Sequence, residues 1–239
     1  MKWIALAAAC ALCLSGETIA LAQGSGAPGV SHAVFTIPGG GTMTYGIAVP
    51  RGPGPHPLIL ALHPGGGRTA YYGSSFMRSI VEPALRDWNA IIVAPDAPTR
   101  SWASDVSERA IVALLEEVMA KFSIDRARVL VTGFSLGGHG TWFFATHRAD
   151  LFTGAIPIAG SPGDEPLEAL GDMPVHIIHS RDDEVVPFRP AADAATHRRE
   201  GGHPVEFTEL EGVGHFTMGA YIQPLQRAGA WMMEQWKRK

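Results

Sequence analysis

Short apolar runs alternate with segments of helical pattern along most of the 239-residue chain, and no other feature constrains the fold as strongly. Strands covered on both faces read as such runs. The runs occupy residues 58–62, 90–94, 129–134, 154–160, 175–179 and 205–210. Helical patterns lie between them at about 74–88, 104–121, 137–148, 188–200 and 219–237. Strands that alternate with helices predict an α/β fold, with a mostly parallel, doubly wound sheet flanked by helices.

Two further β-rich segments precede this alternation. Residues 33–37 and 43–49 are joined by the loop sequence PGGGT, which predicts a β-hairpin. The Pro- and Gly-rich stretch at 50–57 predicts a turn before the first parallel strand. No internal repeat or second domain is indicated.

The first 22 residues have the pattern of a secretory signal peptide. One lysine precedes an apolar run of about a dozen residues, which is too short to span a bilayer. Residues 20–22, Ala-Leu-Ala, form a small-x-small cleavage signal. Cleavage after Ala22 predicts a secreted or periplasmic protein. It also removes both cysteines, Cys10 and Cys13, so the mature chain has no disulfide and no cysteine nucleophile.

Composition argues against several classes of partner. The net charge is −4, from 19 Lys and Arg against 23 Asp and Glu. Only residues 197–199 and 236–239 are locally basic, so we expect no nucleic acid and no stable membrane anchor. The ten histidines show no H-E-x-x-H spacing, so no metal is predicted, and no cofactor is indicated. The sequence leaves the oligomeric state open.

One serine stands at a turn between a predicted strand and a predicted helix. Ser135 follows RVLVTGF and precedes LGGHGTWFFATH. A side chain at so tight a turn crowds the residues two before and two after it, which are Gly133 and Gly137. Neither a dinucleotide fingerprint nor a phosphate loop fits, because Ser135 replaces the second glycine and no Gly-Lys-Ser/Thr is present. The pattern predicts the nucleophile elbow of an α/β-hydrolase fold.

A serine nucleophile needs a histidine base and an acid, which follow it in this fold in the order serine, acid, histidine. His215 lies after the last predicted strand in a glycine-rich loop and is the predicted base. The acid should follow the penultimate strand, where Asp182, Asp183 and Glu184 compete. A tight loop can turn only one of them inward, so we expect the other two to be solvated.

The oxyanion of a tetrahedral intermediate needs two N–H donors. The residue after the nucleophile, Leu136, is one predicted donor. The other should come from residues 62–68, LHPGGGR, where glycines allow close backbone approach. Pro64 has no N–H, so Gly65 or Gly66 is the second donor.

Four blocks, LILALHPGGG, VTGFSLGGHGTW, IIHSRDDEVVP and GVGH, resemble secreted α/β-hydrolase serine esterases. The most similar group is that of polyhydroxybutyrate-depolymerase-like, feruloyl-esterase-like and related carboxylesterases. The resemblance implies one catalytic domain over residues 23–239, with Asp183 as the acid and Gly65 as the second donor. Members usually have His-Gly where this chain has His63-Pro64. Dienelactone hydrolases share the fold but carry cysteine at the elbow, so Ser135 argues against that branch.

Only residues 161–174 separate two of the strands where related enzymes insert a lid, so we expect no cap domain and an open cleft. Such a cleft suits small or polymeric esters as substrates. A peptidase, an acyltransferase or a non-catalytic binding protein of the same fold remains the alternative. Trp142 is expected in the core. The aromatic candidates for the pocket wall are Tyr71, Tyr72, Trp102, His139 and Phe216.

Overall fold

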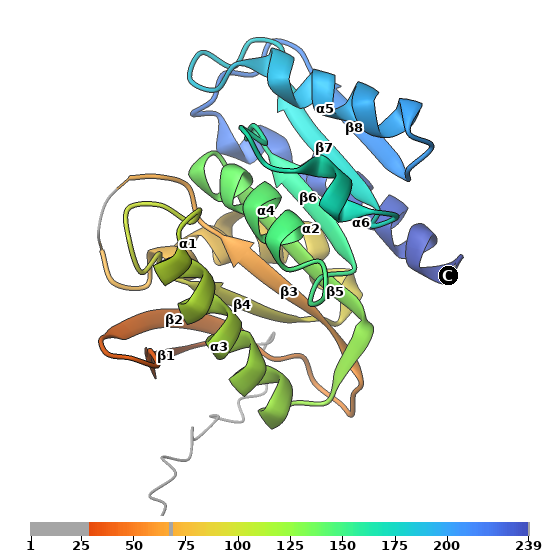
Figure 1. The fold of residues 1–239 in the computed structure, drawn as a ribbon. Helices are drawn as coiled ribbons and strands as arrows, with labels where there is room; N and C mark the ends of the chain where they lie inside the picture. Colours follow the sequence, from red (N-terminus) through yellow and green to blue (C-terminus); the bar gives the residue numbers. More distant parts are fainter. Residues whose placement is uncertain (1–28, 67–68, 239) are drawn as a thin grey trace, which may run out of the picture.

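The computed structural model describes residues 29–66 and 69–238, and the predicted signal peptide of residues 1–22 lies outside them. In this part of the chain eight strands form one sheet in the order β1-β2-β4-β3-β5-β6-β7-β8 (Figure 1). The strands are β1 (Val30–Thr36), β2 (Thr42–Ala48), β3 (His56–Leu62), β4 (Ile91–Pro95), β5 (Ile124–Phe134), β6 (Gly154–Ile158), β7 (Val175–Ser180) and β8 (Val205–Leu210).

The sheet is mostly parallel, as the sequence predicts. β1 and β2 form the predicted hairpin, and β2 runs antiparallel to β4. All other neighbouring strands are parallel. The carboxyl ends of β3, β5, β6 and β7 therefore meet at one edge of the sheet, where ligand sites of open α/β sheets lie.

The helices also follow the predicted segments closely. They are α1 (Tyr72–Phe76), α2 (Glu82–Leu85), α3 (Asp105–Lys121), α4 (Leu136–His147), α5 (Phe188–Glu200) and α6 (Ile222–Lys237). The single helix expected at 74–88 is instead divided, because a π-helical turn, η1 (Met77–Val81), separates α1 from α2 and a 3-10 turn, η2 (Arg86–Trp88), follows. Two further 3-10 turns are η3 (Leu167–Leu170) and η4 (Met218–Tyr221).

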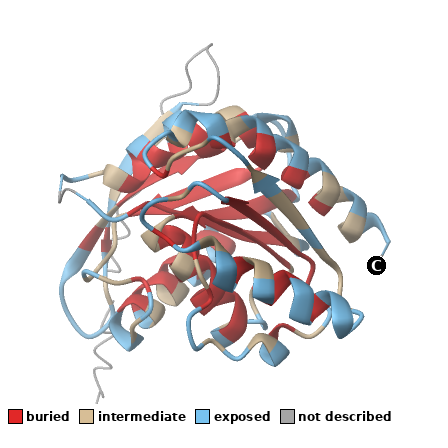
Figure 2. Ribbon diagram, turned by 90° about the horizontal axis from the view of Figure 1, so that it is seen from above, coloured by how far each residue is buried: buried red, intermediate tan, exposed pale blue. Residues whose placement is uncertain are grey.

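Helices cover both faces of the sheet, and the strands are buried between them (Figure 2). β3 shows how the two cores form, because successive side chains of a strand point to opposite faces. Leu58, Leu60 and Leu62 join the core beneath α3, α4 and α5. Ile59 and Ala61 join the core beneath α1, α2 and α6. A strand buried on both sides thus needs apolar residues throughout, which explains the uninterrupted runs in the sequence.

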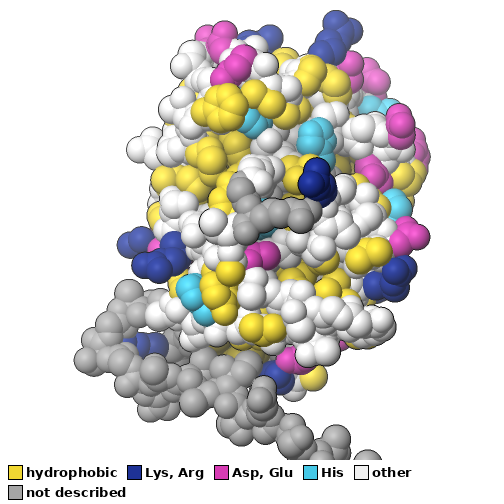
Figure 3. Space-filling model, turned by 90° about the vertical axis from the view of Figure 1, so that its left-hand side faces the viewer, with side chains coloured by type: hydrophobic (Ala, Val, Ile, Leu, Met, Phe, Trp, Pro, Cys, Tyr) yellow, Lys and Arg dark blue, Asp and Glu magenta, His cyan; other side chains and the backbone are white. Residues whose placement is uncertain are grey.

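Figure 3 shows the side of the molecule that lies on the left in Figure 1, where the parallel strands end. Hydrophobic side chains are exposed there among side chains of both charges. None of the helices within residues 29–66 and 69–238 is long and apolar enough to cross a bilayer.

Candidate active site

Ser135 lies at the junction of β5 and α4 in a sparsely populated backbone conformation, with φ 56° and ψ −115°. Such conformations cost about 1–3 kcal/mol and persist only where the surroundings enforce them. A Cβ atom at Gly133 would lie 2.4 Å from the Gly137 carbonyl oxygen, and one at Gly137 would lie 1.9 Å from the Leu62 carbonyl oxygen. The crowding expected on both sides of the serine is therefore confirmed.

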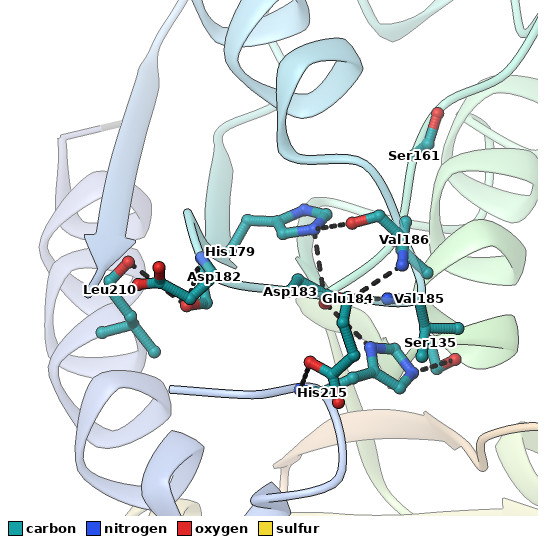
Figure 4. A network of polar contacts seen from close by, with 12 residues as sticks. Ser135, Ser161, His179, Asp182, Asp183, Glu184, Val185, Val186, Leu210 and His215 are labelled. Carbon is teal, nitrogen blue, oxygen red and sulfur yellow. Dashed lines mark hydrogen bonds and ion pairs between the residues drawn. The ribbon is translucent and has the colours of Figure 1, made fainter. Parts of the chain in front are cut away.

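Ser135, His215 and Asp183 lie in one line of hydrogen bonds (Figure 4). The Ser135 hydroxyl donates to His215 Nε2 over 2.7 Å, and His215 Nδ1 lies 2.8 Å from Asp183 Oδ2. His215 is only 4% exposed, and the Asp183 side chain is fully buried. The structure thus brings together the three side chains selected from the sequence.

The buried Asp183 carboxylate is held in its charged form by the groups around it. Burial acts to raise its pKa, but hydrogen bonds from His215 and from two backbone N–H groups outweigh burial, so the pKa lies below its usual value. The N–H groups of Val185 and Val186 donate to Oδ1 over 2.9 and 2.8 Å. Each oxygen therefore has its own donors, and Oδ2 faces the imidazole.

His179 lies behind Asp183 on the side away from His215. Its ring is fully buried, Nε2 donates to the Val186 carbonyl oxygen over 3.0 Å, and the same nitrogen lies 3.5 Å from Asp183 Oδ2. Burial lowers the pKa of His179. The sequence argument set this histidine aside as a strand residue. Its position at the end of β7, four residues before the acid, is the signal that could have drawn attention to it.

Asp182 and Glu184 are solvent-exposed, as expected, but they also make contacts that the sequence did not predict. Each carboxylate accepts a backbone N–H from the loop that carries His215. Asp182 Oδ2 accepts from Gly212 over 2.6 Å, and Glu184 Oε2 accepts from His215 over 2.9 Å. The loop after β8 therefore passes close enough to offer a backbone amide to each of these two acids, whereas Asp183 contacts the imidazole of His215.

Both predicted oxyanion donors line one cavity of about 740 Å³ beside the serine. A Cβ atom at Gly65 would lie 3.7 Å from the Cβ of Leu136, so the two residues face each other. Leu136 is the first residue of α4, where an N–H group has no helical partner one turn earlier. Gly66 also lines the cavity, with φ 145°, and a Cβ there would lie 3.1 Å from the Tyr72 hydroxyl.

His63 and Trp102 support the loop that carries Gly65. His63 Nδ1 donates to the Pro64 carbonyl oxygen over 2.7 Å, and Nε2 accepts from the Ala97 N–H over 3.0 Å. Burial lowers the pKa of His63, consistent with the neutral ring that these contacts need. Trp102 Nε1 donates to the His63 carbonyl oxygen over 3.0 Å. The expectation that Trp102 lines the pocket is corrected, because its side chain is fully buried beneath this loop.

The two tyrosines after this loop, Tyr71 and Tyr72, have different surroundings. Tyr72 lines the cavity, whereas the Tyr71 ring stacks on His32 at 4.1 Å between ring centroids and is not among the cavity residues. Asp96, which sequence reasoning did not select, accepts from the N–H groups of Tyr71 and Gly73 over 2.6 and 2.8 Å. Its position directly after β4 was the available signal, since polar residues at the ends of parallel strands line ligand sites.

The two remaining aromatic candidates lie outside the cavity lining. His139 is half-buried, and its Nδ1 lies 2.6 Å from the Ser161 carbonyl oxygen, which joins α4 to the segment after β6. Phe216 is 80% exposed, and its ring centroid lies 5.5 Å from that of His215. Val185, two residues after Asp183, is likewise exposed, at 49%. Trp142 is fully buried in the core, as expected.

Within residues 29–66 and 69–238, no group of three or more His, Cys, Asp or Glu side chains is arranged to hold a metal ion.

The chain is similar to known esterases in sequence and in fold. Feruloyl esterase C of Emericella nidulans is 31% identical over 144 residues, which cover 56% of this chain and 51% of that protein. Poly(3-hydroxyalkanoate) depolymerase C of Paucimonas lemoignei is 33% identical over 128 residues, which cover 48% of this chain and 30% of that protein. The crystal structure of a thermostable esterase has a TM-score of 0.74 at 27% identity, covering 86% of this chain and 62% of that one.

These similarities confirm the resemblance to α/β-hydrolase esterases, and the chain spans about half the length of the feruloyl esterases that it matches. The argument from Ser135 against the dienelactone hydrolases is wrong at the level of the family. The model of the dienelactone hydrolase family matches residues 82–226, more than half of the chain, so a serine at the elbow does not exclude membership. The chain belongs to the dienelactone hydrolase family.

Proposed function

We propose that this protein is a carboxylic ester hydrolase that works through Ser135, His215 and Asp183. The observation that carries the proposal is the unbroken line of hydrogen bonds from the Ser135 hydroxyl to the buried Asp183 carboxylate. A serine hydroxyl is a weak nucleophile until a neighbouring histidine takes its proton, and the 2.7 Å contact with His215 Nε2 has the length that this transfer needs.

In the acylation step, Ser135 Oγ attacks the ester carbonyl carbon while His215 Nε2 takes the hydroxyl proton. The oxyanion forms between the N–H groups of Leu136 and Gly65, which line the same cavity. Asp183 keeps the Nδ1 proton of His215 in place and stabilises the imidazolium that results. His215 then protonates the leaving alcohol, and the acyl group remains on Ser135.

In the deacylation step, water takes the place of the alcohol. His215 accepts a proton from that water, whose oxygen attacks the acyl carbon, and the second tetrahedral intermediate collapses to release the carboxylic acid and restore the Ser135 hydroxyl. Segment 161–174 contains only the 3-10 turn η3, which leaves the cavity open and admits water to the acyl-enzyme.

Hydrolysis of p-nitrophenyl esters from acetate to palmitate tests the proposal directly. We expect activity that peaks at short chains, because the segment at 161–174 holds only the 3-10 turn η3 and supplies no helical lid that an interface would open. Ser135→Ala and His215→Ala should each lower kcat by about 10⁴–10⁶-fold. An unchanged rate in Ser135→Ala would refute the role of the serine, and no hydrolysis at any chain length would refute the esterase.

Two classes of natural ester should be assayed next. The chain is similar to a feruloyl esterase and to a poly(3-hydroxyalkanoate) depolymerase, so methyl ferulate and a short-chain polyhydroxyalkanoate film are the substrates of choice. We also propose that the protein is exported after cleavage following Ala22. N-terminal sequencing of the exported protein should give Gln23 as the first residue.

A further inference from the structure

The turn after β7 carries three consecutive acids, and all three reach the loop after β8 that contains His215. We define the His215 loop as residues 212–217. Asp183 contacts the imidazole, whereas Asp182 and Glu184 each accept a backbone N–H of the loop, from Gly212 and from His215 itself. The three contacts measure 2.6, 2.8 and 2.9 Å, and Figure 4 shows the acids on the same side of the loop.

The turn that carries the acids is itself fixed to the end of β8. The Arg181 N–H donates to the Leu210 carbonyl oxygen over 2.8 Å, continuing the pairing of β7 with β8. The Ser180 hydroxyl donates to the same oxygen over 3.3 Å and accepts the N–H of Asp182 over 3.2 Å. The acids therefore extend from a rigid part of the sheet, and the loop is the part that they can position.

The His215 loop needs such support because its sequence gives it little stiffness. Gly212 adopts a positive φ of 68°, and Gly214 has no side chain of its own to anchor. The glycine at 214 also leaves room for the Glu184 carboxylate, because a Cβ atom there would lie 3.1 Å from Glu184 Oε2. Fixing the backbone of such a loop costs conformational entropy, which a hydrogen bond to a charged group helps to offset.

We propose that Asp182 and Glu184 are positioning residues that hold the His215 loop by its backbone, so that His215 stays within hydrogen-bonding distance of Ser135. We call these two contacts, Asp182 with the Gly212 N–H and Glu184 with the His215 N–H, the clamp. The inference rests on the proposed function for its kinetic consequence, but the clamp itself can form whether or not the protein hydrolyses esters. Glu184 binds the N–H of the very residue whose ring takes the proton. We expect removal of the Glu184 carboxylate to loosen this residue and to lengthen the 2.7 Å contact between His215 and Ser135.

The test compares variants that delete the acceptor with variants that keep it. In Glu184→Ala and Asp182→Ala the acceptor is lost, whereas in Glu184→Gln and Asp182→Asn an amide oxygen can still accept the same N–H. Glu211→Ala is the matched control, because Glu211 precedes the loop and its largely exposed carboxylate lies 4.0 Å from the nearest partner, Arg181. Both clamp residues are exposed, so their removal leaves no buried charge, and thermal unfolding should verify that the variants fold.

Hydrolysis of p-nitrophenyl butyrate gives the kinetic readout. We expect Glu184→Ala to lower kcat by about ten-fold with KM within two-fold of the wild-type value, because a charge-assisted contact that aligns the base acts on the chemical step. Glu184→Gln should restore most of kcat, Asp182→Ala should have a smaller effect at the far end of the loop, and Glu211→Ala should match the wild type. Equal losses in the alanine and glutamine variants, or none in either, would overturn the proposal.

Amide hydrogen exchange measured by NMR gives a second readout that needs no substrate. The Gly212 and His215 amides should exchange slowly in the wild type and fast in the corresponding alanine variants, with protection largely kept in the asparagine and glutamine variants. If the wild type hydrolyses no ester but shows this pattern, the proposed function fails and the clamp stands. If both amides exchange at the same rate in all variants, the clamp is refuted whatever the kinetics show.

Discussion

Asp183→Asn tests the assignment of the acid more sharply than any other substitution, because the structure dictates how the new amide must lie. Oδ1 of Asp183 accepts the N–H groups of Val185 and Val186. If the amide NH₂ took that place, it would face two donors, so the amide oxygen stays there and the NH₂ group points at His215. His215 Nδ1 must then become an acceptor, and its proton moves to Nε2.

A histidine protonated at Nε2 cannot accept the proton of Ser135. We therefore expect kcat for p-nitrophenyl butyrate at pH 8 to fall by about 10⁴-fold, equivalent to about 5 kcal/mol of transition-state stabilisation. Asp182→Asn is the matched control, since its amide oxygen can still accept the Gly212 N–H. If Asp183→Asn kept more than about 1% of kcat, or if Asp182→Asn were the more damaging change, the assignment of the acid and the reasoning from Oδ1 would be wrong.

Three other experiments probe the elbow, the stability of the fold and the exposed aromatic ring beside His215. Gly137→Ala should fail to fold or melt far below the wild type, because its Cβ would lie 1.9 Å from the Leu62 carbonyl oxygen, whereas Gly219→Ala meets nothing within 4 Å and should melt normally. Burial lowers the pKa of His176 from 6.5 to about 4. The unfolded chain therefore binds the proton more readily, and stability present above pH 6.5 is lost towards pH 4, by roughly 3 kcal/mol in urea unfolding, a slope that His176→Gln should flatten. Phe216→Ala should raise KM for aryl esters with kcat nearly unchanged, since the exposed ring can contact substrate but no reacting atom.

The sequence predicts the sheet and the helices well because burial on both faces leaves a strong pattern. The segments expected at 188–200 and 205–210 coincide with α5 and β8. The division of the helix expected at 74–88 was not predicted in this way, because the π-helical turn η1, which ends just before Glu82 and Pro83, leaves no mark on the pattern of buried residues. The hydrophobic periodicity of a sequence indicates which face of a helix is buried. It does not indicate whether a given turn has α-helical or π-helical hydrogen bonds.

The site could be located in part because chain order carries information. Ser135 at the end of a strand, an acid after the penultimate strand and His215 after the last strand meet because parallel strands end at one edge of the sheet. The aromatic wall was harder to predict. Tyr71 and Tyr72 are neighbours of one residue type, yet one stacks on a histidine and the other lines the cavity. In a loop, the residue type alone does not predict which way a side chain points.

The acids beside Asp183 show why sequence reasoning stops where it does. Three adjacent carboxylates were treated as competitors for one imidazole, because only side-chain partners can be read from residue types. The structure gives each acid its own partner, since backbone N–H groups at Gly212 and His215 come within reach once β8 pairs with β7. Backbone amides have no signature in the sequence. A loop rich in glycine beside a run of acids is nevertheless a readable combination, because unpaired amides and unpaired carboxylates satisfy one another.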